Sequence, residues 1–105
     1  MSEIPAGAAD LDEGAMRTVT LPCGRAAALY HVDGSYYATD DECSHGQSSL
    51  SEEGELEGHK IVCSFHFGSF DIRTGEAIDS PCWEAIRTYA VIERDGELFL
   101  DVADA

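Results

Sequence analysis

The sequence predicts a small all-β domain, a sandwich or barrel of antiparallel strands, and three observations support this fold class. Short β-branched and aromatic runs recur along the chain between Gly, Asp and Ser turn signals. Helical periodicity is weak throughout. The dipeptides Asp33-Gly34 and Asp95-Gly96 each separate two such runs, and glycine accepts the positive φ that tight hairpin turns require. With 105 residues, 44% of them hydrophobic, we expect one domain over residues 1–105.

The expected elements follow the chain in order. Strands are predicted at residues 16–21, 26–32, 35–39, 60–62, 69–71, 85–92 and 97–102. A third hairpin turn is indicated at Arg73-Thr74-Gly75, and Ser80-Pro81 marks a further loop. One helical turn is expected at residues 48–53, which Gly54 ends. Residues 1–14 carry few apolar anchors, so we expect them to be extended or poorly ordered.

The charge limits the class of partner. Six Lys and Arg against twenty-one Asp and Glu give a formal net charge of −15, which makes nucleic acid or an anionic membrane surface an unfavourable partner. The charge favours a basic protein partner. The alternative is that it only keeps a small protein soluble. Because no targeting segment and no bilayer-spanning apolar run is evident, we expect a soluble, cytoplasmic protein.

Two short motifs carry the chemistry. Cys43-Ser44-His45 is followed, after seventeen intervening residues, by Cys63-Ser64-Phe65-His66. Each motif offers one thiolate and one imidazole at a loop, so the two loops together present two sulfur and two nitrogen ligands. This donor set predicts a metal centre.

Two kinds of centre accept such a donor set. In one class of [2Fe–2S] cluster, two cysteines bind one iron and two histidines bind the other, whereas zinc takes mixed sulfur and nitrogen ligands in a closed tetrahedron. Zinc fingers usually keep like ligands together, while here each motif contributes one of each kind. The alternation favours the two-iron centre. A zinc-stabilised binding module, or four unconnected core residues, are the alternatives.

The remaining cysteines and histidines are given no ligand role. Cys23 and Cys82 are expected to be small, buried thiols, because no export signal favours disulfides. His31 is expected to be an ordinary strand residue and His59 to lie in a solvated turn.

The surroundings of the two motifs add a family resemblance. The residues that carry it are Cys43-Ser44-His45-Gly46, Leu50-Ser51, Gly54, Leu56-Glu57-Gly58, Cys63-Ser64-Phe65-His66, Phe70-Asp71, Thr74-Gly75 and Pro81. This stretch resembles the Rieske [2Fe–2S] ferredoxins that serve bacterial aromatic-ring dioxygenases. The resemblance implies a Rieske-type fold with a cluster-binding subdomain made of two loops. It also implies one [2Fe–2S] cluster, with Cys43 and Cys63 on the inner iron and His45 and His66 on the outer iron.

The same resemblance separates this chain from the Rieske proteins of respiratory cytochrome complexes. Ser48 and Phe65 stand where those proteins carry a second pair of cysteines, so the disulfide between the loops is not expected. Gly68 and Phe70 stand where they carry a serine and a tyrosine whose hydroxyls bond to sulfur. Because each hydroxyl donor would stabilise the reduced cluster, their absence predicts a low potential, roughly −150 mV rather than values near +300 mV.

The resemblance implies a single-electron carrier and not an enzyme. Its donor would be an NAD(P)H-dependent flavoprotein reductase and its acceptor a terminal aromatic-ring-hydroxylating oxygenase, and we expect a monomer that forms transient complexes. The acidic runs Asp40-Asp41-Glu42 and Glu52-Glu53-Gly54-Glu55 flank the motifs and are expected to assist docking. A catalytic oxygenase subunit would need a further non-heme iron domain, which 105 residues do not accommodate. The alternative is a small redox subunit of a larger oxidoreductase, such as a nitrite-reductase-type complex.

Overall fold

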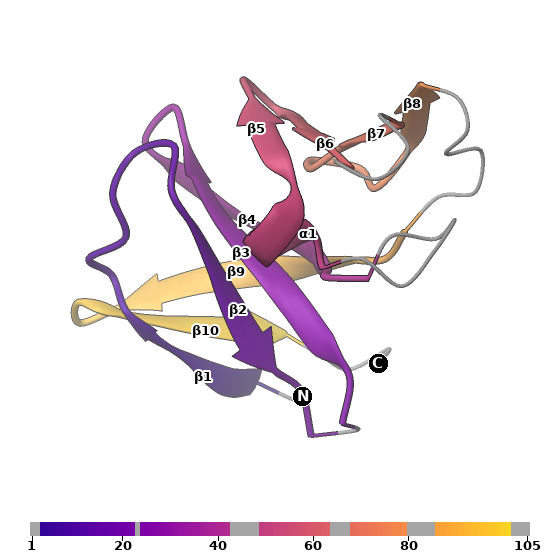
Figure 1. Cartoon of the computed structure of the whole chain (residues 1–105). Coiled ribbons are helices and arrows are strands. Elements are labelled where there is room, and N and C mark those ends of the chain that lie inside the picture. Colours follow the sequence, from indigo (N-terminus) through magenta and orange to yellow (C-terminus); the bar gives the residue numbers. More distant parts are fainter. Residues whose placement is uncertain (1–2, 23, 43–48, 64–67, 80–85, 102–105) are drawn as a thin grey trace.

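The computed structural model describes residues 3–22, 24–42, 49–63, 68–79 and 86–101, and these residues form two antiparallel sheets (Figure 1). The larger sheet has the strand order β1-β10-β9-β4-β3-β2. Its strands are β1 (Glu3–Ala8), β2 (Met16–Thr20), β3 (Ala26–Val32), β4 (Ser35–Asp40), β9 (Thr88–Arg94) and β10 (Glu97–Asp101). The smaller sheet contains β5 (Glu55–Glu57), β6 (Lys60–Val62), β7 (Ser69–Asp71) and β8 (Ala77–Asp79), in that order. The predicted all-β fold class is confirmed.

The short-range turn predictions are confirmed. Asp33 and Gly34 join β3 to β4 with φ values of 54° and 76°, and Asp95 and Gly96 join β9 to β10 with 53° and 78°. Positive φ at both central residues is the geometry that matches the twist of a two-residue hairpin. Arg73-Thr74-Gly75 likewise lies between β7 and β8, which pair antiparallel.

The predicted helical turn is also confirmed, as α1 (Leu50–Glu53). Ser49 caps it, because its Oγ accepts a hydrogen bond of 3.3 Å from the backbone N–H of Glu52. In the part of the chain that the structure describes, no helix is long and apolar enough to cross a membrane.

Three strands are not among those predicted. β1 lies in the segment expected to be extended or poorly ordered, and it pairs with β10 along its whole length apart from a register shift between Pro5 and Gly7. Proline and glycine both weaken the sequence signal of a strand. β5 (Glu-Leu-Glu) and β8 (Ala-Ile-Asp) were missed because each is short and consists mostly of Glu, Ala or Asp, which are depleted in strands. That residues 1–105 form a single domain stays a prediction.

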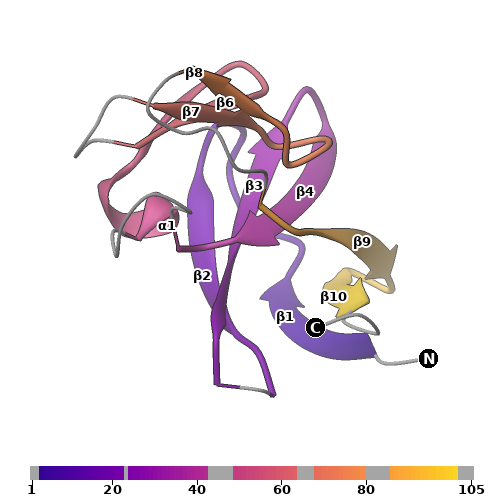
Figure 2. The same cartoon turned by 90° about the vertical axis from the view of Figure 1, so that its right-hand side faces the viewer.

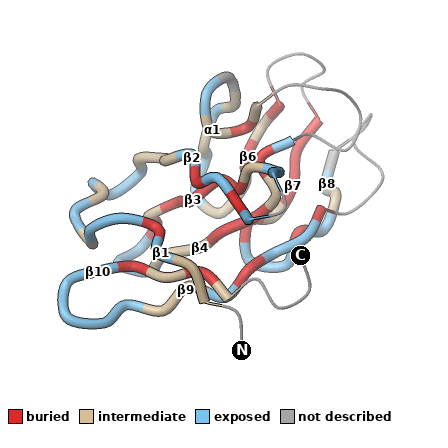
Figure 3. The backbone as a smooth tube through the Cα atoms, turned by 90° about the horizontal axis from the view of Figure 1, so that it is seen from below, coloured by how far each residue is buried: buried red, intermediate tan, exposed pale blue. Residues whose placement is uncertain are grey.

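Most of strand β3 is buried (Figure 3), and its residues contribute to two hydrophobic cores on its two faces. The first, called here the inter-sheet core, consists of Ala28, Tyr30, Val32, Leu50, Ile61, Cys63, Phe70, Ile72 and Ile86. The second, the barrel core, consists of Ala6, Val19, Leu21, Ala27, Leu29, Ala38, Tyr89, Leu98 and Leu100. Successive residues of β3 alternate between the two cores, as the period of two in a strand requires. The inter-sheet core therefore joins the small sheet to the large one.

The large sheet curls into a near-barrel whose outer strands are β1 and β2 (Figures 1 and 2). Arg17 of β2 joins these two strands, since its Nη1 donates to the carbonyl oxygens of Ala6 (3.2 Å) and Ala8 (3.0 Å). Its Nη2 donates to Asp10 Oδ1 at 2.7 Å. Gly7 has a φ of 98°, and a Cβ there would lie 2.6 Å from Arg17 Nη1. The positive φ favours glycine at this position, and a larger residue would also displace the guanidinium from β1.

Candidate metal centre

The two ligand motifs are described to different extents. Cys63 belongs to the described residues, whereas Cys43, His45 and His66 lie outside them. The predictions for Ser48, Phe65, Pro81, Cys23 and Cys82 also fall outside the described residues. The structure does show how the chain enters and leaves each motif.

The first motif lies in a segment whose two ends are paired. Glu42 forms an antiparallel bridge with Ser49, and the N–H of Leu50 donates to the carbonyl oxygen of Asp41 at 2.7 Å. Asp41 follows the end of β4, and Leu50 begins α1. The two ends of the segment 43–48 are therefore held together at one narrow base.

The second motif lies at the end of the β6–β7 hairpin. Val62 pairs with Ser69, and one residue further the N–H of Cys63 donates to the carbonyl oxygen of Gly68 at 2.7 Å. Residues 64–67 connect these paired ends. The side chain of Cys63 is only 1% exposed and belongs to the inter-sheet core.

The bases of the two motifs share that core. Leu50, five positions after His45, and Cys63, in the second motif, both belong to it. Gly54 brings α1 close to β6, because a Cβ at this position would lie 2.6 Å from the carbonyl oxygen of Leu50 and 3.0 Å from that of Val62. The two segments thus start from neighbouring points of the fold, as expected of loops that hold one centre.

The donor chemistry fits a [2Fe–2S] cluster. Cysteine thiolates and histidine imidazoles are the two ligand types of a Rieske cluster. Cys63, buried at the end of β6, can supply one of the thiolates. Zinc is compatible with the same donors. Elsewhere in the described ranges, no group of three or more His, Cys, Asp or Glu side chains could hold a metal ion.

Comparison with known proteins identifies the family. The model of the Rieske [2Fe-2S] domain matches residues 4–90 of this chain. The chain belongs to the Rieske [2Fe–2S] domain family. Among its relatives, the ferredoxin component of the p-cumate 2,3-dioxygenase system of Pseudomonas putida is 50% identical over 93 residues, which cover 89% of this chain and 79% of that protein. The ferredoxin component of the naphthalene 1,2-dioxygenase system of Pseudomonas putida is 40% identical over 90% of this chain and 88% of its own length.

Solved structures agree with this assignment. The Sphingomonas yanoikuyae B1 ferredoxin superimposes with a TM-score of 0.88 at 37% identity, covering 95% of this chain and 98% of that one. A chain in the complex of reduced oxygenase and oxidized ferredoxin in carbazole 1,9a-dioxygenase has the same TM-score, 0.88, and also 37% identity, over 93% and 91% of the two chains. The predicted Rieske-type fold is confirmed.

The Rieske hairpin β6–β7 presents no hydroxyl at the two positions singled out in the sequence. Gly68 has no side chain, and Phe70 is fully buried in the inter-sheet core together with Cys63. Neither position can therefore donate a hydroxyl hydrogen bond. The lack of such donors favours a low reduction potential in a Rieske cluster.

Hydrogen bonds shift the pKa values of several groups in the Rieske fold. Tyr89 donates its hydroxyl to Asp40 Oδ1 at 2.6 Å, and burial together with this hydrogen bond raises the pKa of Tyr89 to about 12. The side-chain hydrogen bonds from Arg73 lower the pKa of Asp71 on β7. These groups therefore keep their ordinary charge at neutral pH.

The two histidines outside the motifs make contacts of their own. His31 is a strand residue, as predicted, and its ring stacks on that of Tyr36 with centroids 4.3 Å apart. His59 lies in the turn between β5 and β6, but it is half-buried and meets the Tyr37 ring edge to face at 5.6 Å. The expectation of a solvated turn is wrong for its side chain, because Tyr37 on β4 covers it.

The burial of Asp41 differs from what its acidic run predicted. It belongs to an acidic run expected at a docking surface, yet it is only 5% exposed. Its carboxylate accepts hydrogen bonds from Ser49 Oγ at 2.6 Å and from the N–H of Ser51 at 2.8 Å. The donor Ser49 is recognisable in the sequence as a helix cap. Ser49 with Glu52 three residues later is a capping pattern that marks where α1 begins.

Proposed function

We propose that this protein is the ferredoxin of an aromatic-ring dioxygenase system, a carrier that delivers single electrons to a terminal oxygenase. The observation that carries the proposal is the 50% identity to the p-cumate 2,3-dioxygenase ferredoxin component over 89% of the chain. Such relatives are separate ferredoxin components and not catalytic subunits. The terminal oxygenase of carbazole 1,9a-dioxygenase from Nocardioides aromaticivorans IC177 also contains this fold, but the match covers only 30% of that chain at 26% identity.

The ligands in this proposal are Cys43 and Cys63 on the inner iron and His45 and His66 on the outer iron. When bound, the [2Fe–2S] cluster accepts one electron and releases it again. Cys63 anchors the centre in the inter-sheet core, where its burial keeps water from the sulfur. Gly68 and Phe70 withhold the hydroxyl donors that would raise the potential, so we expect a value roughly at the −150 mV end of the Rieske range.

Both partners belong to the proposal. The acceptor is a terminal oxygenase, which is supported by the 37% identity to a chain from a complex of oxygenase and ferredoxin. The donor is an NAD(P)H-dependent flavoprotein reductase, because a carrier of single electrons needs a component that divides the two electrons of a hydride, and flavins do so.

The first test is spectroscopic. The protein, prepared without air and reduced with dithionite, is expected to contain iron and acid-labile sulfide in equal amounts and to give the electron paramagnetic resonance signal of a Rieske cluster. Alanine at His45 or at His66 should abolish that signal, because each removes a ligand. His59→Ala is the matched control and should leave the signal unchanged, since His59 packs against Tyr37 outside both motifs. A colourless protein that binds only zinc would contradict the proposal.

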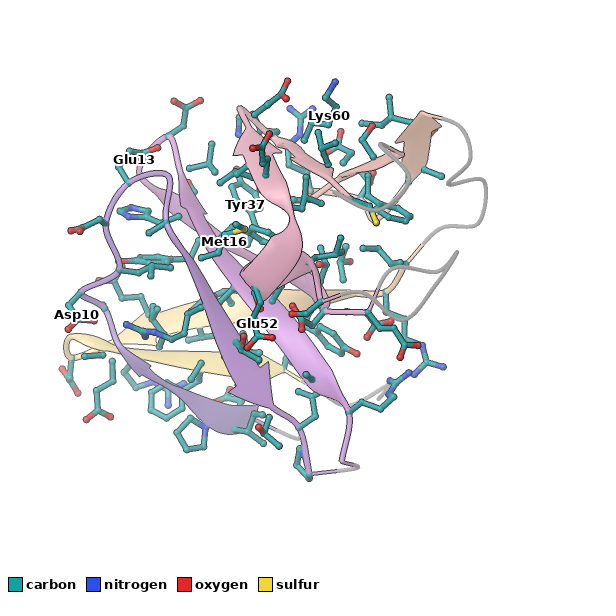
Figure 4. All side chains as sticks on the ribbon, in the orientation of Figure 1. Asp10, Glu13, Met16, Tyr37, Glu52 and Lys60 are labelled. Atoms are coloured by element: carbon teal, nitrogen blue, oxygen red, sulfur yellow. The ribbon has the colours of Figure 1, made fainter. Side chains whose placement is uncertain are left out.

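A second prediction concerns the encounter with the partner. Glu42, Glu52 and Glu55 are exposed acids on either side of the first motif, and Glu52 on α1 is labelled in Figure 4. Replacing all three by glutamine is expected to slow association with the oxygenase about tenfold at low salt, because charge complementarity accelerates encounter. The difference should shrink as salt screens the charges. Stopped-flow electron transfer at several salt concentrations measures it.

The matched control carries the same change of charge at the other end of the molecule. Glu93→Gln, Asp95→Asn and Glu97→Gln alter three exposed acids at the β9–β10 hairpin. We expect this triple variant to associate at nearly the original rate. Equal slowing of both variants would mean that net charge, and not the position of the acids beside the first motif, governs the encounter.

A further inference from the structure

Asp41 is a buried acid that the proposed electron transfer does not use. Carboxylates are rarely buried unless they are paired or hydrogen-bonded, because loss of hydration is costly. Asp41 is 5% exposed, and its two carboxylate oxygens accept from different donors, Oδ2 from Ser49 Oγ (2.6 Å) and Oδ1 from the N–H of Ser51 (2.8 Å). Both donors lie beyond the first motif, whereas Asp41 lies before it.

The main chain of Asp41 makes two further bonds. Its N–H donates to the carbonyl oxygen of Ala26 on β3 at 3.1 Å, and its carbonyl oxygen accepts from the N–H of Leu50 at 2.7 Å. The residue is therefore tied to the large sheet on one side and to residues 49–51 on the other. We call this set, Asp41 with Ser49, Leu50 and Ser51, the Asp41 clamp.

The clamp is itself held by neighbouring elements. Ser49 Oγ, which donates to Asp41, also accepts from the N–H of Glu52 and so caps α1. Ser51 Oγ is hydrogen-bonded to Thr18 Oγ1 on β2. Both ends of the segment 43–48 are thus fixed relative to β2, β3 and α1 by neutral hydrogen bonds. The two ends are joined to each other by the bonds to the Asp41 carboxylate, which are charge-assisted and stronger than neutral ones.

We propose that Asp41 is a positioning residue that holds the first motif at the spacing needed to retain the cluster. The inference rests on the proposed ligand role of Cys43 and His45, which lie between the two halves of the clamp in the sequence. Ligands must be held close to their binding geometry, and loss of the residues that orient them typically weakens metal retention 10- to 100-fold. The main-chain bridge between Glu42 and Ser49 already closes the base of the segment 43–48. The additional bonds to the Asp41 carboxylate therefore serve to fix the geometry of that base.

The test measures release of the cluster. Holoprotein is mixed with excess iron chelator, and the decay of its visible absorbance is followed. Asp41→Ala is expected to lose the cluster about 10- to 100-fold faster than the original protein. Asp41→Asn should be intermediate, because its amide oxygen still accepts one of the two bonds. The paramagnetic resonance signal of reduced Asp41→Ala should also be broadened, because the ligand geometry becomes less uniform.

Two control variants separate positioning from general stability. Asp12→Asn makes the same change of charge at an exposed site and should release the cluster at the original rate. Thr39→Val removes a buried hydroxyl that lies 2.9 Å from Tyr30 Oη and also donates to the carbonyl oxygen of Asp40 at 2.9 Å. It lowers stability but removes none of the hydrogen bonds made by the four residues of the clamp. We expect Asp41→Ala to release the cluster faster than Thr39→Val does at equal loss of thermal stability.

The outcomes are distinct. If wild-type protein never contains iron and sulfide, the proposed function fails. If it holds a normal cluster and Asp41→Ala releases that cluster at the original rate, only the positioning role is overturned. If Asp41→Ala and Thr39→Val fall on one line of release rate against stability, Asp41 is merely structural and the positioning role is again overturned.

Discussion

Replacing Gly75 by alanine is expected to lower the free energy of unfolding by about 3 kcal/mol, a large part of the stability of a small domain. Gly75 has a φ of 78°, where an L-residue costs about 1–2 kcal/mol. A Cβ there would clash with the carbonyl oxygen of Ile86. The main chain has little room to retreat, because the N–H of Ile86 donates to the carbonyl oxygen of Gly75 at 2.9 Å. Ile86 would move, and it belongs to the inter-sheet core.

The matched control for this prediction is Gly96→Ala. Gly96 has the same φ, 78°, but a Cβ there would meet nothing within 4 Å. Its replacement therefore carries only the conformational cost, about 1 kcal/mol. Urea unfolding of both variants gives the difference in the free energy of unfolding. Thermal unfolding is expected to show a midpoint temperature lower by about 12 °C or more for Gly75→Ala. Equal destabilisation of the two variants would show that the contact with Ile86 has no energetic weight.

Arg17→Met is expected to lower the free energy of unfolding by about 2 kcal/mol and to loosen the near-barrel. The methionine keeps most of the aliphatic stem, so the variant mainly removes the bonds from the guanidinium to the carbonyl oxygens of Ala6 and Ala8. A hydrogen bond from a charged donor contributes about 1.5–3 kcal/mol, and partial exposure of Arg17 reduces that value. Thermal unfolding should show a midpoint lower by about 8 °C or more.

Hydrogen exchange localises the effect of Arg17→Met. Amides of β1 and β2 should exchange faster, because these outer strands lose the side chain that joins them. Arg94→Met is the control, since Arg94 pairs with Glu3 at 3.2 Å in an exposed ion pair and lies over the Phe99 ring. Exposed pairs contribute only about 0–1 kcal/mol. If both variants lose equal stability, the closure of the barrel does not depend on Arg17.

Local features of this fold are accessible from the sequence. The hairpins at Asp33-Gly34 and Asp95-Gly96 follow from residues that tolerate positive φ, and α1 follows from a Ser cap and a terminating glycine. The proposed donor set is also a local feature, because each motif has a Cys and a His at short spacing in the sequence. Each of these depends on interactions among residues that are close in the chain.

Other features needed the tertiary structure. β1 becomes a strand because it pairs with β10, more than ninety positions away in the case of Glu3 and Asp101. Neither its Pro nor its Gly predicts that pairing. Phe70 and Cys63 share one core because β6 and β7 pair and then pack on β3. The close approach of Gly54 to Val62 is likewise set by packing between segments.

The sequence by itself determined the fold class, the hairpin turns and the mixed Cys and His content of the two motifs, because turn geometry and donor chemistry depend on individual residues and their spacing. Only the tertiary structure decided which acids face solvent. Asp41 and Glu42 are adjacent in one acidic run, yet Asp41 is buried and Glu42 is exposed. The physical reason is that burial of a carboxylate depends on donors supplied elsewhere in the fold, here by Ser49 and Ser51 across the first motif.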